Sequence, residues 1–183
     1  LGCDKNLADS EEMLGLLTGN GHEIVDSEEE ADAIVINTCC FIHDAKEESV
    51  NTILEMAEYK KNGTCKILIV TGCMAQRYKE EITEEIPEVD AVLGTTSYGD
   101  IVKALNEAEA GHVFQEFKDI NALPEDSGRR VITTGGHFGY LKIAEGCDKH
   151  CTYCIIPSLR GKFRSVPEER LLKQAEYMAS QGV

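Results

Sequence analysis

Hydrophobic and polar residues alternate along the first two thirds of the chain in a pattern typical of a parallel sheet covered by helices. Short runs of apolar, β-branched residues predict buried strands, and we place these at 33–37, 66–71 and 91–93, with a further short strand at 22–25. Apolar residues recur at helical spacing between these runs, over 6–17, 45–61, 75–86 and 99–110. The pattern predicts an α/β fold, an open parallel sheet with flanking helices.

The periodicity fails between 118 and 136, where glycine, proline and charged residues gather, and we interpret this stretch as an interdomain linker. A strand at 140–144 then leads into a loop, and a helix opened by a proline follows over 167–180. One strand, one loop and one helix cannot close a core. We therefore expect a domain at 1–117, the linker, and at 137–183 the opening β-loop-α unit of a larger, truncated α/β domain.

Charge is divided unevenly along the 183 residues, whose formal net charge is −15. Residues 1–128 hold 28 Asp and Glu against 9 Lys and Arg, whereas 129–170 hold 4 against 8. An acidic surface disfavours broad binding to nucleic-acid phosphates and is compatible with a basic protein partner. The sequence shows neither a secretory segment nor an apolar run long enough to span a bilayer, so we expect a cytoplasmic protein.

Three of the eight cysteines stand in one short run, Cys147-Asp-Lys-His-Cys151-Thr-Tyr-Cys154. In a reducing compartment, clustered cysteines indicate a metal site or catalysis. A structural zinc site uses four ligands, usually in two separated pairs, whereas three thiolates on one loop can hold three irons of a four-iron cluster and leave the fourth open. The alternatives are a zinc site completed by His150 or a distant cysteine, and a chance group of free thiols.

Three more cysteines follow predicted strands. Cys3 follows the presumed end of a first strand, Cys39 follows the strand at 33–37, and Cys73 follows the strand at 66–71. Ligands of open parallel sheets gather beyond the carboxyl ends of the strands, so these three side chains should lie close together. The alternative for each cysteine is that of a small buried hydrophobic residue.

Other polar and thiol residues carry weaker signals. Cys40 and Cys65 are expected to be packing residues, because Cys65 lies at the opposite end of its strand and Cys40 should point away from Cys39. The acidic run at 9–12 is expected to stabilise the start of a helix. The basic stretch at 160–164 is either a binding loop for an anionic group or a solvated turn.

The spacing of Cys147, Cys151 and Cys154 resembles the signature of the radical S-adenosylmethionine superfamily. The resemblance implies that these cysteines bind a 4Fe-4S cluster at the top of a TIM-type barrel. Its open iron would chelate S-adenosyl-L-methionine, whose reductive cleavage yields a 5′-deoxyadenosyl radical. By the same resemblance, Tyr153 occupies the position whose backbone meets the adenine.

The front of the chain narrows the resemblance to the methylthiotransferase family. The motifs that carry it are Leu1-Gly-Cys-Asp-Lys-Asn-Leu-Ala-Asp-Ser-Glu11, Asn37-Thr-Cys39 and Thr71-Gly-Cys73. In that family one cysteine of each motif holds an auxiliary 4Fe-4S cluster, which maps here to Cys3, Cys39 and Cys73. Gly-Cys-x-Lys-Asn with Asp-Ser-Glu resembles the RimO-type branch, as does the stretch Tyr140-Leu-Lys-Ile-Ala-Glu-Gly-Cys147.

The resemblance implies an enzyme that inserts a methylthio group at the β-carbon of an aspartate in a small-subunit ribosomal protein, with electrons from a reducing system. The alternative is the same chemistry on an adenosine of tRNA, and a second alternative is a non-catalytic iron–sulfur or zinc module. The remainder of the radical domain and the TRAM domain of this family are not in the chain. We therefore expect the chain alone to be inactive.

Overall fold

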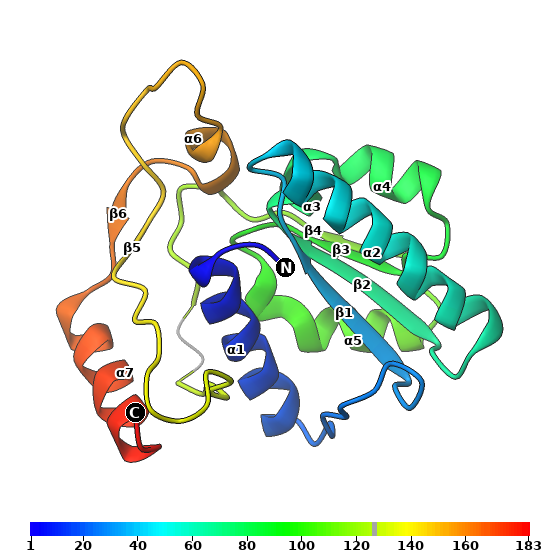
Figure 1. Cartoon of the computed structure of the whole chain (residues 1–183), viewed down its shortest axis with the longest axis horizontal. Helices are drawn as coiled ribbons and strands as arrows, with labels where there is room; N and C mark the ends of the chain where they lie inside the picture. Colours follow the sequence, from blue (N-terminus) through cyan, green and yellow to red (C-terminus); the bar gives the residue numbers. More distant parts are fainter. Residues whose placement is uncertain (126–127) are drawn as a thin grey trace.

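The structure, a computed structural model, describes residues 1–125 and 128–183. Four parallel strands form its central sheet in the order β1-β2-β3-β4 (Figure 1). The strands are β1 (Ala33–Thr38), β2 (Ile67–Gly72), β3 (Ala91–Leu93) and β4 (Phe114–Glu116). β1 and β2 pair over their full length, from Ala33 opposite Ile67 to Thr38 opposite Gly72. Both strands therefore end at the same level.

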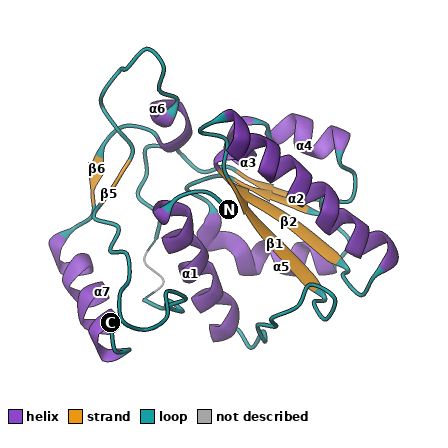
Figure 2. Ribbon diagram, in the orientation of Figure 1, coloured by secondary structure: helices purple, strands orange, loops and turns teal. Residues whose placement is uncertain are grey.

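Helices cover both faces of this sheet (Figure 2). One face packs against α2 (His43–Asn62), α3 (Cys73–Arg77) and α4 (Lys79–Glu85). The other face packs against α1 (Asp4–Gly19) and α5 (Ile101–Glu109), the latter preceded by the 3-10 turn η1 (Tyr98–Asp100). Successive strand residues point to opposite faces, so Leu68 and Val70 enter the first core while Ile67 and Ile69 enter the second.

The C-terminal segment, residues 137–183, lies beside α1 rather than on the sheet (Figure 1). Its elements are β5 (Ala144–Glu145), α6 (Ile156–Arg160), β6 (Arg164–Ser165) and α7 (Glu168–Ser180). β5 and β6 form a small antiparallel pair. Lys5 of α1 donates a hydrogen bond to the Ala144 carbonyl at 2.6 Å, and the Tyr177 hydroxyl donates to the Arg130 carbonyl at 2.6 Å. The segment is therefore tied both to α1 and to the residues that connect it to the sheet.

The expected parallel sheet with flanking helices is confirmed, and the three strongest predicted strands lie within one residue of β1, β2 and β3. Residues 22–25 form no strand, and 75–86 is two helices instead of one. Of the strand expected at 140–144 only the last residue belongs to β5. The described parts of the predicted linker, 118–125 and 128–136, contain no helix or strand, and 126–127 lies outside the described residues.

None of the helices in the described residues combines the length and the apolar character needed to span a bilayer.

Candidate functional site

Cys39 and Cys73 leave the sheet at the same edge. Thr38, the last residue of β1, lies opposite Gly72, the last residue of β2, and each cysteine follows directly. The Thr38 hydroxyl ties the two connections together, because it donates to the Thr71 carbonyl at 2.5 Å and accepts from the Ala75 amide at 3.4 Å. The predicted juxtaposition of these two positions at the carboxyl end of the strands is confirmed.

Cys3 reaches this edge from α1, whose first residue follows it. The side-chain amide of Asn6 donates to the Thr38 carbonyl at 2.9 Å, and Asn37 donates back to the Asn6 carbonyl at 2.9 Å. Gly2 passes close to Cys39: an added Cβ at Gly2 would lie 2.8 Å from the Cys39 Cβ and 3.3 Å from its sulfur. Glycine at this position therefore allows the backbone directly before Cys3 to pack against Cys39.

The three thiols also act on one another electrostatically. Burial raises the pKa of the Cys73 thiol, and Cys39 and Cys3 raise it further. The Arg160 guanidinium, which comes from α6 after the second cysteine run, offsets these effects only in part, so the pKa of Cys73 stays above its ordinary value. A cation at a buried thiol favours the thiolate, which is the form that binds metals.

Cys40 and Cys65 occupy the positions expected of packing residues. Both are buried, and each thiol donates to a backbone carbonyl: Cys40 to Cys73 at 3.3 Å and Cys65 to Ile67 at 3.2 Å. Burial, together with Cys73 and Cys39, raises the pKa of Cys40 to about 11, although Arg77 acts in the opposite direction. Burial also raises the pKa of the Cys65 thiol.

Cys147, Cys151 and Cys154 lie on one loop between β5 and α6. Cys151 is exposed and the other two are partly buried. The Cys147 amide donates to the Gly161 carbonyl at 3.0 Å, which closes the base of the loop, and the Cys154 amide donates to Cys151 at 3.0 Å. Tyr153 is 88% exposed at the outer part of this loop, and His150 is exposed as well.

The types of residue at the two cysteine regions fit iron–sulfur clusters. Six cysteines in two groups of three supply soft thiolate ligands of the kind that hold such clusters. Among the described residues, no group of three or more His, Cys, Asp or Glu side chains is spaced to hold a metal ion. A four-iron cluster is much larger than a single ion, so its three thiolates stand farther apart than the ligands of one ion. The fit therefore rests on the residue types, three cysteines in each region, and not on a coordination geometry.

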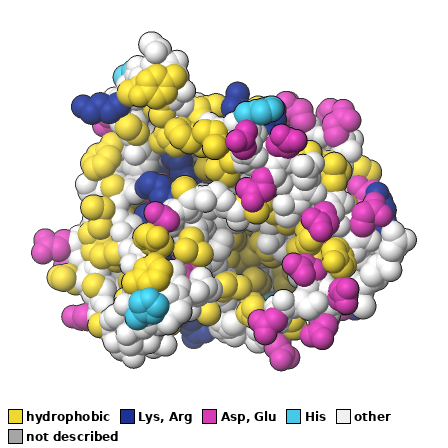
Figure 3. Space-filling model, in the orientation of Figure 1, with side chains coloured by type: hydrophobic (Ala, Val, Ile, Leu, Met, Phe, Trp, Pro, Cys, Tyr) yellow, Lys and Arg dark blue, Asp and Glu magenta, His cyan; other side chains and the backbone are white. Residues whose placement is uncertain are grey.

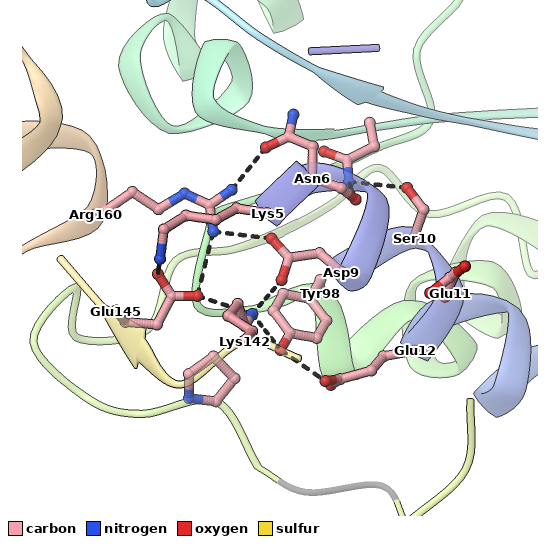
Figure 4. A network of polar contacts seen from close by, with 12 residues as sticks. Lys5, Asn6, Asp9, Ser10, Glu11, Glu12, Tyr98, Lys142, Glu145 and Arg160 are labelled. Atoms are coloured by element: carbon pink, nitrogen blue, oxygen red, sulfur yellow. Dashed lines mark hydrogen bonds and ion pairs between the residues drawn. The ribbon is translucent and has the colours of Figure 1, made fainter. Parts of the chain in front are cut away.

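A buried network of charged and polar groups joins α1, which follows Cys3, to residues on either side of the run at 147–154 (Figure 4). Asp9 of α1 accepts from Arg160 at 2.8 Å and also pairs with Lys142. Lys142 pairs in turn with Glu145 at 2.8 Å. The side chains of these residues are at most 8% exposed. Burying four charges requires each to be paired, so the network fixes the C-terminal segment against α1.

A second buried pair lies farther along α1. Arg130 donates to the Glu11 carboxylate at 2.7 Å, and the amide of Thr133 donates to the other carboxylate oxygen at 2.7 Å. Glu12 accepts from the Tyr98 hydroxyl at 3.0 Å. The interpretation of 9–12 as residues that stabilise a helix start was therefore wrong, because α1 begins at Asp4 and these acids lie in its middle turns.

In the basic stretch at 160–164, residues 161–163 form a loop, as expected, but Arg160 is neither in a loop nor in solvent. Arg160 belongs to α6 and is 3% exposed. One sequence signal pointed to this outcome: Asn6, Asp9 and Glu12 recur every third residue on one face of a predicted helix, in an acidic region followed by a basic one. Which cation pairs with which acid depends on contacts more than a hundred residues apart, and sequence spacing carries no such information.

Comparison with known proteins identifies one matching family and several similar relatives that share one name. Residues 1–94 match a family described as "Uncharacterized protein family UPF0004". The chain is 63% identical over its whole length to the ribosomal protein uS12 methylthiotransferase RimO of Lachnoclostridium phytofermentans. It is 50% identical to proteins of the same name from Clostridioides difficile and Acetivibrio thermocellus.

The chain spans 42%, 41% and 42% of these three relatives, respectively, although each match includes all of the chain. The matched family covers β1, β2, β3 and the cysteines at the edge of the sheet, while the relatives also cover β4 and the run at 147–154. The chain therefore belongs to the UPF0004 family, within which the relatives that match its whole length are of the RimO type.

Proposed function

We propose that this chain is the cluster-binding part of a methylthiotransferase that adds a methylthio group to the β-carbon of an aspartate in a small-subunit ribosomal protein. The observation that carries the proposal is the gathering of Cys3, Cys39 and Cys73 at one edge of the sheet. An auxiliary cluster at that edge distinguishes a sulfur-inserting enzyme from a simple radical generator. The names of the relatives support the same substrate class.

Two groups of residues hold the proposed cofactors. Cys3, Cys39 and Cys73 hold one 4Fe-4S cluster. Cys147, Cys151 and Cys154 hold a second cluster, whose open iron takes S-adenosyl-L-methionine, and Tyr153 contacts its adenine. When bound, these groups supply the one-electron chemistry that an unactivated C–H bond requires. The protein residues hold the clusters, exclude water and align the two sites.

The proposed domain organisation follows from the same assignment. Residues 1–117 form the auxiliary-cluster domain, 118–136 connect it, and 137–183 open a radical S-adenosylmethionine domain of the TIM-barrel type. We place the protein in the cytoplasm, where a reducing system supplies the electrons.

The distribution of charge favours a protein substrate over tRNA. Asp and Glu side chains gather over α2 and neighbouring elements in Figure 3, and residues 1–128 hold 28 acidic against 9 basic residues. A surface of this sign attracts a basic protein and repels a phosphate backbone.

The test uses the complete protein in which this sequence occurs, reconstituted without oxygen and supplied with a reductant and S-adenosyl-L-methionine. Ribosomal protein uS12 and tRNA are offered in separate reactions, and mass spectrometry measures the added methylthio group. We expect modification of an aspartate in the protein, loss of it in Cys73→Ala, and retention in the matched variant Cys65→Ala. Modification of tRNA alone would overturn the assignment of substrate.

A further inference from the structure

Arg160 lies where the two cysteine regions meet. It ends α6, the short helix after the Cys147–Cys154 run, and its side chain is 3% exposed. Its guanidinium donates to the Asn6 side chain at 2.7 Å, to Asp9 at 2.8 Å and to Glu145 at 3.4 Å (Figure 4). These partners come from α1 and β5, so one side chain bridges three elements.

The partners of Arg160 lead directly to the sheet edge. Asn6, which accepts from Arg160, donates at the same time to the Thr38 carbonyl that precedes Cys39. α6 also packs on α3, which begins at Cys73, and Leu159 belongs to the same core as Cys73. The hydroxyl of Thr95 donates to the Leu159 carbonyl at 2.7 Å, which fixes the backbone next to Arg160.

Arg160 is equally close to the base of the other cysteine loop. The carbonyl of its neighbour Gly161 accepts from the Cys147 amide at 3.0 Å. Glu145, two residues before Cys147, accepts from the same guanidinium. A planar guanidinium can satisfy several acceptors in fixed directions, whereas an ammonium group acts as a point charge.

We propose that Arg160 is a positioning residue that holds the loop of Cys147, Cys151 and Cys154 in a fixed relation to the edge of Cys3, Cys39 and Cys73. As a statement about two clusters, the proposal rests on the proposed function. As a statement about two cysteine regions, it stands on the contacts of the guanidinium. A buried cation at the edge also stabilises the reduced form of a cluster there and raises its reduction potential, because opposite charges attract strongly where water is excluded.

Arg130 provides a matched control. It is also a buried arginine, 5% exposed, and it also pairs with an acid of α1, but its partner is Glu11, which points away from Asp9 and Arg160 in Figure 4. Arg160→Gln removes one buried cation from two carboxylates, Asp9 and Glu145, whereas Arg130→Gln removes one buried cation from Glu11. If Arg160 had only a structural role, both variants should change the coupling and the potential of the clusters by the same amounts.

The first experiment uses the complete protein with reconstituted clusters and compares Arg160→Gln, Arg160→Lys and Arg130→Gln. Electron paramagnetic resonance measures the magnetic coupling between the two reduced clusters, and a redox titration in a Cys147→Ala background measures the potential of the auxiliary cluster. We expect Arg160→Gln to change the coupling and shift the potential to a more negative value. Arg130→Gln should leave both at their native values.

Arg160→Lys separates charge from geometry. It retains the cation, so the potential should stay close to native, but it cannot contact Asn6 and Asp9 in the same fixed directions, so the coupling should still change. If Arg160→Gln does not fold, Arg160→Lys alone still tests whether Arg160 sets the coupling between the clusters. Native coupling and native potential in the Arg160 variants, or equal shifts in Arg130→Gln, would overturn the proposal.

Hydrogen exchange in the metal-free protein tests the positioning role even if no cluster binds. Arg160→Gln should raise exchange at the Cys147 amide, which bonds to Gly161, whereas Arg130→Gln should raise it at the Val131 amide, which bonds to the Glu11 carbonyl. If the native protein binds no cluster but the two variants show these separate changes in exchange, the proposed function is rejected and the positioning role stands. Unchanged exchange at Cys147 in Arg160→Gln would reject the positioning role.

Discussion

At the scale of single residues, Gly72 determines how the chain turns from β2 into α3 and places Cys73. Its φ of +94° lies in the region that side chains rarely adopt. An added Cβ would lie 2.4 Å from both the Asn37 side-chain oxygen and the Thr38 carbonyl. The close approach of β1 and β2 at their carboxyl ends therefore requires glycine here.

Gly72→Ala should lower the free energy of unfolding by about 3 kcal/mol, because backbone strain and a clash with backbone atoms add together. Urea denaturation measures the change. Gly99→Ala is the control, since an added Cβ at Gly99 has no neighbouring atom within 4 Å, and its effect should stay within about 0.5 kcal/mol. Equal stability of the two variants would contradict this account of the edge.

Asp9 is the second residue on which the arrangement depends, because it pairs with both Lys142 and Arg160. Asp9→Ala leaves two buried cations with fewer partners, and we expect a loss of about 3–5 kcal/mol in the free energy of unfolding. Asp32→Ala breaks an ion pair with Lys66 in which both side chains are at least 75% exposed, and it should have no measurable effect. A small effect of Asp9→Ala would show that the network adds little to stability.

At the scale of elements, α1 packs on two sides. Ala8 and Met13 are buried, Met13 in the core shared with α5, whereas Asp9, Glu11 and Glu12 are buried against Tyr98 and the residues from Arg130 onward. Burial raises the pKa of Glu12, and Lys142 and Tyr98 offset this only in part. The protonated form of Glu12 is therefore favoured by folding, which makes this contact sensitive to pH.

The sign of that dependence follows from the raised pKa. The folded protein binds the Glu12 proton more tightly than the unfolded chain, so the free energy of unfolding falls as pH rises from about 4.3 through the folded pKa. Glu12→Gln removes this contribution. Between about pH 4 and about pH 7, its free energy of unfolding should fall less, or rise more, than that of the native protein in urea denaturation. The exposed variant Glu55→Gln should follow the native curve.

A helix or strand can be predicted from the sequence when its own residues carry a clear apolar pattern. β1 and β2 are continuous apolar runs buried on both faces, so their sequence alone identifies them. β4 has three residues, Phe-Gln-Glu, and lies at the edge of the sheet, so it carries no apolar run. α6 has five residues and a proline near its start, too few to show a helical period.

The residues of the candidate sites also differ in whether local sequence pattern predicts their positions. The positions of Cys39 and Cys73 follow from strand ends, which local pattern predicts. The burial of Arg160 and Lys142 follows from the docking of the C-terminal segment on α1, which local pattern does not predict. Charged residues are almost never buried without partners, so a sequence reading places them in solvent until the partners are known.

At the scale of the whole molecule, an acidic front part and a C-terminal segment meet through a buried polar interface. The segment also carries exposed apolar side chains, which Figure 3 shows over β5, β6 and α7. Exposed apolar residues that precede β5 and β6 in the chain are Phe138, Tyr140, Leu141, Ile143 and Phe163. The polar network sets the relation between the two cysteine regions, and the proposed chemistry needs both regions to act together.

The central claim is that six of the eight cysteines form two separate cluster sites. Its most direct test is the iron content of the complete protein after reconstitution with iron and sulfide without oxygen. We expect about eight irons per chain, about four after either Cys73→Ala or Cys147→Ala, and no loss after Cys65→Ala. Binding of a single iron or zinc, or an equal loss of iron in all three variants, would contradict the claim.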